Sequence, residues 1–198
     1  WEWGSILLPI LMLKPNIGAP LLALLGIWLL IQKRYKSILV IASGLILLLV
    51  IGLLQNPHWV QDYWMIGNTK VAATFGGSPT VWGLGGLISH NQRAGILMVG
   101  SLAGLLVLLG FFVIILRNRK KLPLASVLAL AVTVTLLITP YTWTYDQVLL
   151  VLPITLLILA LDQMGVRLLF NALVFLGLDA FIIVLLYYDT ILHAEILN

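Results

Sequence analysis

Long apolar runs separated by short polar breaks make up most of the chain. The runs cover residues 4–13, 17–31, 37–54, 95–116, 122–139, 147–161 and 168–188. Several of them approach or exceed the length of about 20 residues that an α-helix needs to cross a hydrocarbon core roughly 30 Å thick. The pattern therefore predicts an all-α, polytopic transmembrane helical bundle with about seven membrane segments.

Composition leaves little room for a soluble fold. Hydrophobic residues make up 62% of the 198 residues and charged residues 9%, whereas an average soluble chain has roughly 25% charged residues. The net charge of +4 would favour acidic partners in a soluble protein, but most of the cations lie in two short clusters, where they act as topology signals. We therefore expect membrane lipids as partners and no nucleic acid. The chain has no cysteine, which excludes disulfides and thiol metal sites.

The basic clusters predict the orientation of the chain. We assign residues 33–36 and 117–121 to the cytoplasmic side, and the even number of segments between them is consistent with that assignment. The Lys and Arg residues placed inside are 33, 34, 36, 117, 119, 120, 121 and 167, against 14, 70 and 93 outside. We expect an integral, multi-pass protein of a bacterial plasma membrane, with residues 55–94 and the C-terminus outside.

A helix break that carries a cation interrupts the first two apolar runs. The segment Lys14-Pro15-Asn16-Ile17-Gly18 lies between residues 6–13 and 19–31, and neither run is long enough for a comfortable span. A lysine at membrane depth costs several kcal/mol unless it pairs or reaches the headgroups, so it marks a site for an anion. The break also requires that the freed backbone groups face protein or a polar cavity. We predict an outward-facing pocket for an anionic substrate, with Lys14 an unpaired cation whose removal spares folding.

The external segment 55–94 is longer than an ordinary connection, and such segments tend to carry function. Its aromatic rings stand beside carboxylates, amides and cations, a combination that suits a sugar, because a pyranose face packs on a ring while its hydroxyls bind polar groups. The candidates in this segment include His58, Lys70, Trp82 and Arg93. The alternative is that the aromatic residues are interface anchors and that residues 76–79 form only a turn.

A second external motif runs from Thr139 to Asp146, at the start of the sixth apolar run. Asp146 either caps the following helix and complements its dipole, or binds a sugar hydroxyl or a divalent ion.

Asp179 is different, since it lies inside the last apolar run and must find a partner on another helix or be neutral. For Asp179 we favour a structural interhelical hydrogen bond over a catalytic role.

Three of these elements, taken in order, resemble one enzyme family. Leu13-Lys14-Pro15-Asn16, followed by an apolar helix and a basic turn, is similar to the Leu-Lys-Pro-Gln element of the GT-C membrane glycosyltransferases of family 87, the polyprenol-phosphate-mannose-type transferases. The stretch from Gly77 to Leu84 resembles that family's external Pro-Ser-x-x-Gly-Leu segment. The stretch from Thr139 to Leu150 resembles its late Ser-Pro-x-Ser-x-x-x-Asp helix start.

The resemblance implies a GT-C-like fold and a hexosyltransferase. Such an enzyme moves a hexose, here mannose, from a polyprenyl-phosphate-linked sugar to a glycolipid or glycan acceptor at the outer face of the membrane. The implied substrate-binding residues are Lys14, Asn16, His58, Lys70, Trp82, Arg93, Trp143, Tyr145 and Asp146. Lys14 would then stabilise the departing phosphate. No metal site and no cofactor are assigned, although the use of a divalent cation as a cofactor stays an open alternative.

One feature of the superfamily has no counterpart in these residues. Its enzymes carry an acidic residue, taken to be the general base, in the first external loop, whereas Glu2 is the only nearby acid here and the topology puts it towards the inner side. We therefore interpret residues 1–198 as the C-terminal transmembrane portion of a membrane glycosyltransferase, with the N-terminal part missing, and expect it to be inactive alone. Two alternatives stay open: a transporter or flippase for lipid-linked sugars, and a non-catalytic membrane subunit.

Overall fold

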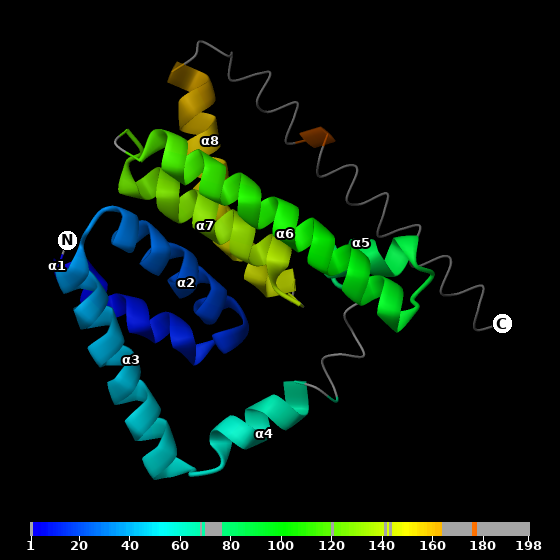
Figure 1. Cartoon of the computed structure of the whole chain (residues 1–198). Helices are drawn as coiled ribbons and strands as arrows, with labels where there is room; N and C mark the ends of the chain where they lie inside the picture. The colour runs from blue at the N-terminus through cyan, green and yellow to red at the C-terminus, as the bar shows by residue number, and fades with distance from the viewer. Residues whose placement is uncertain are drawn as a thin grey trace. The chain divides into compact units, whose positions relative to one another are not determined.

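The computed structural model describes residues 2–67, 69, 77–119, 121–140, 142, 144–163 and 176–177 (Figure 1). Every regular element within these ranges is helical, which confirms the all-α prediction. In chain order, with η marking a 3₁₀-helix, the elements are α1 (Glu2–Leu7), η1 (Leu8–Leu13), α2 (Pro15–Ile31), α3 (Tyr35–Gln55), α4 (Trp59–Ile66), α5 (Val81–Ile88), α6 (Arg93–Asn118), α7 (Leu124–Ile138), η4 (Thr144–Leu150) and α8 (Val151–Gln163). Contacts divide the chain into two units, residues 1–153 and 154–198, and each is described by itself.

Among the described residues, two helices are long and apolar enough to cross a membrane. They are α3, with 21 residues, and α6, with 26 residues, which correspond to about 32 and 39 Å of helix. The other predicted runs that the structure describes form shorter elements, and α2 and α7 have only 17 and 15 residues. At about 26 and 23 Å, both are shorter than a bilayer core of roughly 30 Å. The structure therefore contains two candidates for the seven expected membrane spans, and the other five stay a prediction from the sequence.

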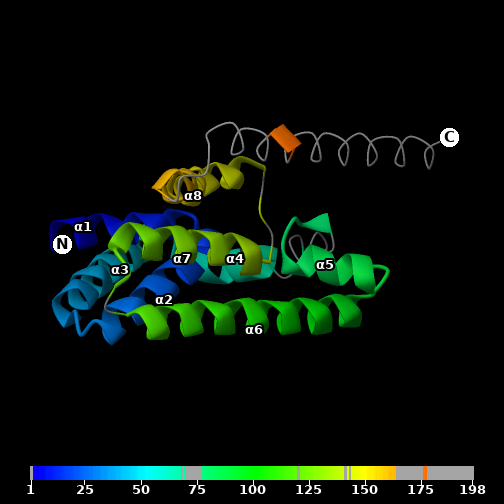
Figure 2. The same ribbon diagram turned by 90° about the horizontal axis from the view of Figure 1, so that it is seen from above.

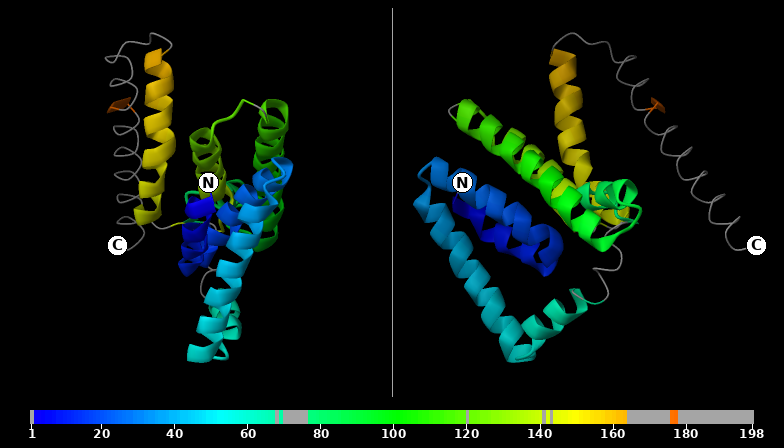
Figure 3. Two further views of the ribbon diagram at one scale, coloured as in Figure 1. Left: turned by 90° about the vertical axis from the view of Figure 1, so that its left-hand side faces the viewer. Right: turned by 45° about the vertical axis from the view of Figure 1, so that its right-hand side comes forward.

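The N-terminal segment folds back on itself as a helical hairpin. The chain changes from α1 to η1 next to Pro9, which lacks the N–H that an α-helix would donate to the carbonyl of Ser5. It then turns at Lys14, and α2 returns alongside η1 (Figures 1 and 3). The two arms approach closely at Gly18, where a Cβ would lie 2.0 Å from the carbonyl oxygen of Leu11. Lys14 therefore stands at the tip of the hairpin.

The core of the first unit lies where α2, α6 and α7 meet. Figure 2 shows α6 and α7 running alongside each other, and α2 contacts α7. The fully buried side chains at this junction include Phe111, Ile115 and Val127, and Leu25 and Trp28 of α2 join the same cluster. This packing holds the N-terminal end of α2 close to the C-terminal end of α7.

The long helices α3 and α6 present apolar side chains that the protein does not cover. On α6 the buried positions are on one face and include Gly100, Gly104 and Phe111, whereas many leucines on the other faces are exposed. On α3 only Ser37 and Ile41 are buried. An apolar helix with so little protein around it is typical of contact with lipid.

The second unit is described in part only. Its described residues are those of α8 from Ile154 to Gln163 and residues 176–177. Most of the predicted run 168–188 lies outside the described residues, and so does Asp179. The interhelical hydrogen bond expected for Asp179 stays a prediction.

Candidate functional site

The polar segments singled out in the sequence converge at the C-terminal end of α7. The ammonium of Lys14 pairs with the carboxylate of Asp146, which follows α7 in the chain. The hydroxyl of Thr139 donates to the carbonyl oxygen of Asn16 at 3.1 Å, and the indole N–H of Trp82 donates to the carbonyl oxygen of Ile138 at 2.8 Å. We call this group the α7-end cluster: Lys14, Asn16, Trp82, Thr135, Thr139 and Asp146.

The ion pair joins residues that lie 132 positions apart. Asp146 is only 4% exposed, whereas Lys14 is 36% exposed, so the carboxylate lies inside the protein and the lysine faces outward from it. Asp146 lies in the first turn of η4, and Lys14 precedes Pro15, the first residue of α2. The hairpin tip therefore delivers the cation to the helix start that carries the acid.

The pairing corrects one prediction from the sequence. Lys14 was expected to be an unpaired cation that requires an external anion, but Asp146 supplies a carboxylate within the same chain. The sequence could not reveal this, because nothing in either motif specifies that a hairpin tip and a helix start so far apart will meet. The alternative interpretation of Asp146 as a helix cap took no account of Lys14 at all.

A proline in α2 explains the hydrogen bond of Thr139. In a regular α-helix the N–H of residue 20 would donate to the carbonyl of residue 16, but residue 20 is a proline and has no N–H. The hydroxyl of Thr139 supplies a donor in its place, and its single hydrogen is shared between the carbonyl of Asn16 at 3.1 Å and that of Thr135, in its own helix, at 2.7 Å. The requirement that backbone groups freed at a helix break face protein is therefore met for Asn16.

Trp82 caps α7 from another part of the chain. The last carbonyls of a helix lack partners within it, and Pro140 has no N–H to donate to them. The indole of Trp82 binds one of them, Ile138, while its ring packs on α6 at Gly100, where a Cβ would lie 2.6 Å from atom Cε3. Thr80 positions the tryptophan by capping α5 through a hydrogen bond of 3.3 Å from the backbone N–H of Trp82.

Three buried polar atoms near these contacts have no hydrogen-bond partner among the described residues. They are Nδ2 of Asn16, Oγ of Ser78 and Oγ1 of Thr135. Leaving such a group unpaired costs about 1–3 kcal/mol, so a water or a polar ligand is the expected partner. Amide and hydroxyl groups of this kind are the ones that bind phosphate oxygens and sugar hydroxyls.

The remaining predicted site residues are elsewhere or are not described. His58 lies just before α4, where its Nδ1 is 3.3 Å from Oε1 of Gln61, and Arg93 is the exposed first residue of α6. No described contact links either residue to the α7-end cluster. Lys70 and Trp143 lie outside the described residues, as does the side chain of Tyr145. The described part of the chain also holds no group of three His, Asp or Glu residues that could bind a metal ion.

Sequence reasoning missed Thr135, Thr139 and Ser78 as site residues. Ser78 lies in the motif 77–84 and Thr139 begins the motif 139–146, but neither residue was assigned a role. A usable indication was present, because Thr135 and Thr139 are four residues apart and hence share a helix face. A proline four residues after Asn16 also implies that the carbonyl of Asn16 needs a donor from another part of the chain.

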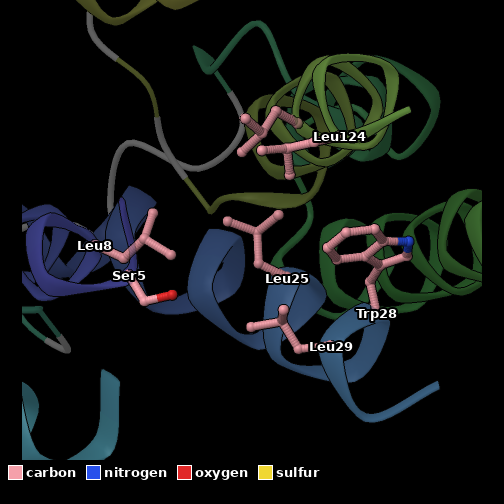
Figure 4. A pocket seen from close by; sticks show the side chains of 7 residues that line it. Ser5, Leu8, Leu25, Trp28, Leu29 and Leu124 are labelled. Atoms are coloured by element: carbon pink, nitrogen blue, oxygen red, sulfur yellow. The ribbon is translucent and has the colours of Figure 1, made fainter. Parts of the chain in front are cut away.

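An apolar cavity lies between the hairpin and α7. It has a volume of about 420 Å³ and is lined by Ser5, Leu8, Leu25, Trp28, Leu29, Leu124 and Leu128. Figure 4 shows Leu8, Leu25 and Leu124 pointing towards a shared space. The lining is almost entirely aliphatic and aromatic, so the cavity suits a hydrocarbon chain.

Comparison of the chain with models of known protein families, with curated proteins and with solved structures finds no match. The resemblance to the GT-C transferases of family 87 therefore stays a prediction from the sequence.

Proposed function

We propose that the chain forms part of a membrane-embedded glycosyltransferase that moves a hexose, mannose, from a polyprenyl-phosphate donor to an acceptor at the outer face. The α7-end cluster would bind the phosphate and the sugar of the donor. One observation carries the proposal: three motifs that resemble those of such enzymes, separated by long apolar helices, meet at one helix end. A chance resemblance gives no reason for the three to be neighbours in space.

The ion pair gives Lys14 the properties of a preorganised cation. Asp146 fixes where the ammonium lies, and the 36% exposure of Lys14 lets a ligand reach it. A cation held in place where negative charge develops on the leaving phosphate lowers the barrier by several kcal/mol in a site that excludes water. In this proposal Asp146 is a positioning residue, and Lys14 contacts the donor.

The helix lengths support a site below the membrane surface. If the long helices α3 and α6 span the bilayer, then α2 and α7 are several ångströms too short to do so. Their ends at the α7-end cluster would then be recessed from the outer surface. A lipid-linked phosphate lies at about this depth, because its isoprenoid tail must stay in the hydrocarbon.

The apolar cavity is a candidate place for part of that tail. Leu25 lines this cavity, and it lies about 15 Å along α2 from Pro15. Pro15 is the residue next to the tip of the hairpin. A donor with its phosphate at Lys14 could therefore run along α2 and reach the cavity with its isoprenoid units. The chain would in this way provide one site for the polar head and another for the apolar tail.

The proposal is tested by a sugar-transfer assay with the protein that contains this chain. With polyprenyl-phosphate mannose as donor, we expect a new glycosidic bond, and we expect Lys14→Ala to lower turnover about 100-fold or more. Lys36→Ala is the matched control, since it removes an exposed lysine from the start of α3, and it should leave turnover unchanged.

Loss of activity through unfolding must be separated from loss of the phosphate contact. The variant Lys14→Ala/Asp146→Ala removes both charges and should keep the fold, yet it should stay inactive. Normal turnover in either Lys14 variant would contradict the proposal. Movement of labelled donor across the membrane without a glycosidic bond would instead identify a transporter.

A further inference from the structure

The two basic turns of the chain come together at the opposite end of the helices from the α7-end cluster. One turn joins α2 to α3 and the other joins α6 to α7. The side chain of Gln32 in the first turn donates through Nε2 to the carbonyl oxygen of Arg119 in the second, at 2.5 Å. The structure thus merges two clusters that are separate in the sequence into one basic patch: Lys33, Arg117, Arg119 and Lys121.

A cavity opens within this patch. It has a volume of about 340 Å³, and Leu116, Arg117, Asn118, Arg119 and Lys121 line it. Three of the lining residues are cations, namely Arg117, Arg119 and Lys121. Among the described side chains, no carboxylate forms an ion pair with any of them. Like charges gathered around one cavity repel each other and lower the stability of the fold, unless an anion binds between them.

The surroundings of the cavity are apolar. Leu116 is part of its lining and is 54% exposed, and Val113, one turn earlier on α6, is 60% exposed. A cavity that is lined by three cations and lies at the end of an exposed apolar helix face matches a molecule that has both a negative head and hydrocarbon chains. A soluble anion would use the cations but leave the apolar border exposed.

We propose that this cavity binds the phosphate headgroup of an anionic phospholipid, with the acyl chains lying along the exposed face of α6. The arginines provide forked donors for the phosphate oxygens, and Asn118 and Lys121 add further donors. The bound lipid would also hold the two turns together beyond the contact of Gln32. This site is independent of the proposed transferase activity, since it lies at the other end of α2 and α7.

Native mass spectrometry of the detergent-solubilised chain can test the proposal. We expect phosphatidylglycerol to bind in preference to phosphatidylcholine with the same acyl chains. Each basic residue near a membrane surface contributes about fivefold to such a preference, so Arg117→Gln/Arg119→Gln/Lys121→Gln should reduce it about 100-fold. The single variant Lys121→Gln should reduce it about fivefold. Arg93→Gln, which removes a cation from the other end of α6, should leave it unchanged.

Conservative variants and a free anion complete the test. Arg117→Lys/Arg119→Lys keeps the charge and should keep most of the preference for phosphatidylglycerol. Equal binding of the two lipids, or an unchanged preference in both the triple variant and Lys121→Gln, would overturn the proposal. If inorganic phosphate raises the melting temperature of the chain as much as phosphatidylglycerol does, the ligand is a free anion and the lipid assignment is wrong.

Discussion

At the scale of single residues, the two members of the Lys14–Asp146 pair are not equivalent. Asp146 is 4% exposed and Lys14 is 36% exposed. A charge that loses its partner inside the protein stays desolvated, whereas a partly exposed charge can turn towards solvent. The pair should therefore respond asymmetrically to substitution.

We predict that Lys14→Ala destabilises the chain by about 3 kcal/mol, because it removes the cation that pairs with the buried carboxylate of Asp146. Asp146→Asn should cost less, since the remaining lysine reaches solvent. Lys14→Ala/Asp146→Ala should be more stable than Lys14→Ala alone. Thermal unfolding in detergent measures all three, and equal stability of Lys14→Ala and the native chain would show that the ion pair is not structural.

We predict that the hydroxyl of Thr139 stabilises the folded chain because Pro20 cannot donate a hydrogen bond to the carbonyl of Asn16. Thr139→Val should destabilise the chain by about 1–3 kcal/mol, because the carbonyl of Asn16 loses its donor. In a Pro20→Ala background the new N–H can bind that carbonyl, so the same substitution should cost less. Thr133→Val is the matched control, since that hydroxyl donates only to Ala129 in its own helix, and it should have little effect. Equal costs of Thr139→Val in the two backgrounds would refute the link to Pro20.

At the scale of helices, close packing of α5 on α6 positions Trp82. A Cβ at Gly100 would lie 2.6 Å from the indole, whereas a Cβ at Gly110 of the same helix would meet nothing within 4 Å. We predict that Gly100→Ala displaces the indole, breaks its hydrogen bond to Ile138 and lowers the melting temperature. Gly110→Ala should be neutral or slightly stabilising, as alanine is favoured over glycine in a helix. Tryptophan fluorescence and thermal unfolding report both effects, and equal results for the two variants would contradict this packing.

The helical elements could be predicted from the sequence to a large extent, because apolar runs between polar breaks specify helices directly. The lengths were predicted less well. The run 4–13 changes to a 3₁₀-helix beside Pro9, and the run 147–161 begins within η4 before α8. These changes depend on which carbonyls lack a donor and on what packs nearby, and the period of the apolar pattern does not contain that information.

The candidate site could be predicted only in part. Lys14, Asn16, Trp82 and Asp146 were identified, since a cation or an aromatic ring next to a helix break stands out in an apolar chain. Their pairing depends on which helix ends meet, and that is a property of the tertiary packing of α2 on α7. Thr135 was missed for a related reason, because a threonine inside an apolar run looks like part of the run.

At the scale of the whole molecule, the side of the membrane on which each end of the helices lies stays a prediction from the basic clusters. The α7-end cluster and the basic patch lie at opposite ends of α2 and α7. We predict that single cysteines at Gln61 and Asn118 react with an impermeant thiol reagent from opposite sides in sealed vesicles. The native chain has no cysteine, so it serves as the blank. Reaction of both positions from the same side would contradict the orientation.

The binding of a lipid-linked donor to the α7-end cluster is the central claim, and a direct binding measurement tests it best. The detergent-solubilised chain is titrated with polyprenyl-phosphate mannose and, separately, with the unphosphorylated polyprenol. We predict that the phosphorylated donor binds at least about tenfold more tightly than the polyprenol, as expected for a charge-assisted contact worth about 1.5–3 kcal/mol. The variant Lys14→Ala/Asp146→Ala should remove this difference in affinity, and Lys36→Ala should keep it. Equal affinity for the two ligands, or an undiminished difference in the double variant, would contradict the assignment of the cluster as the phosphate site.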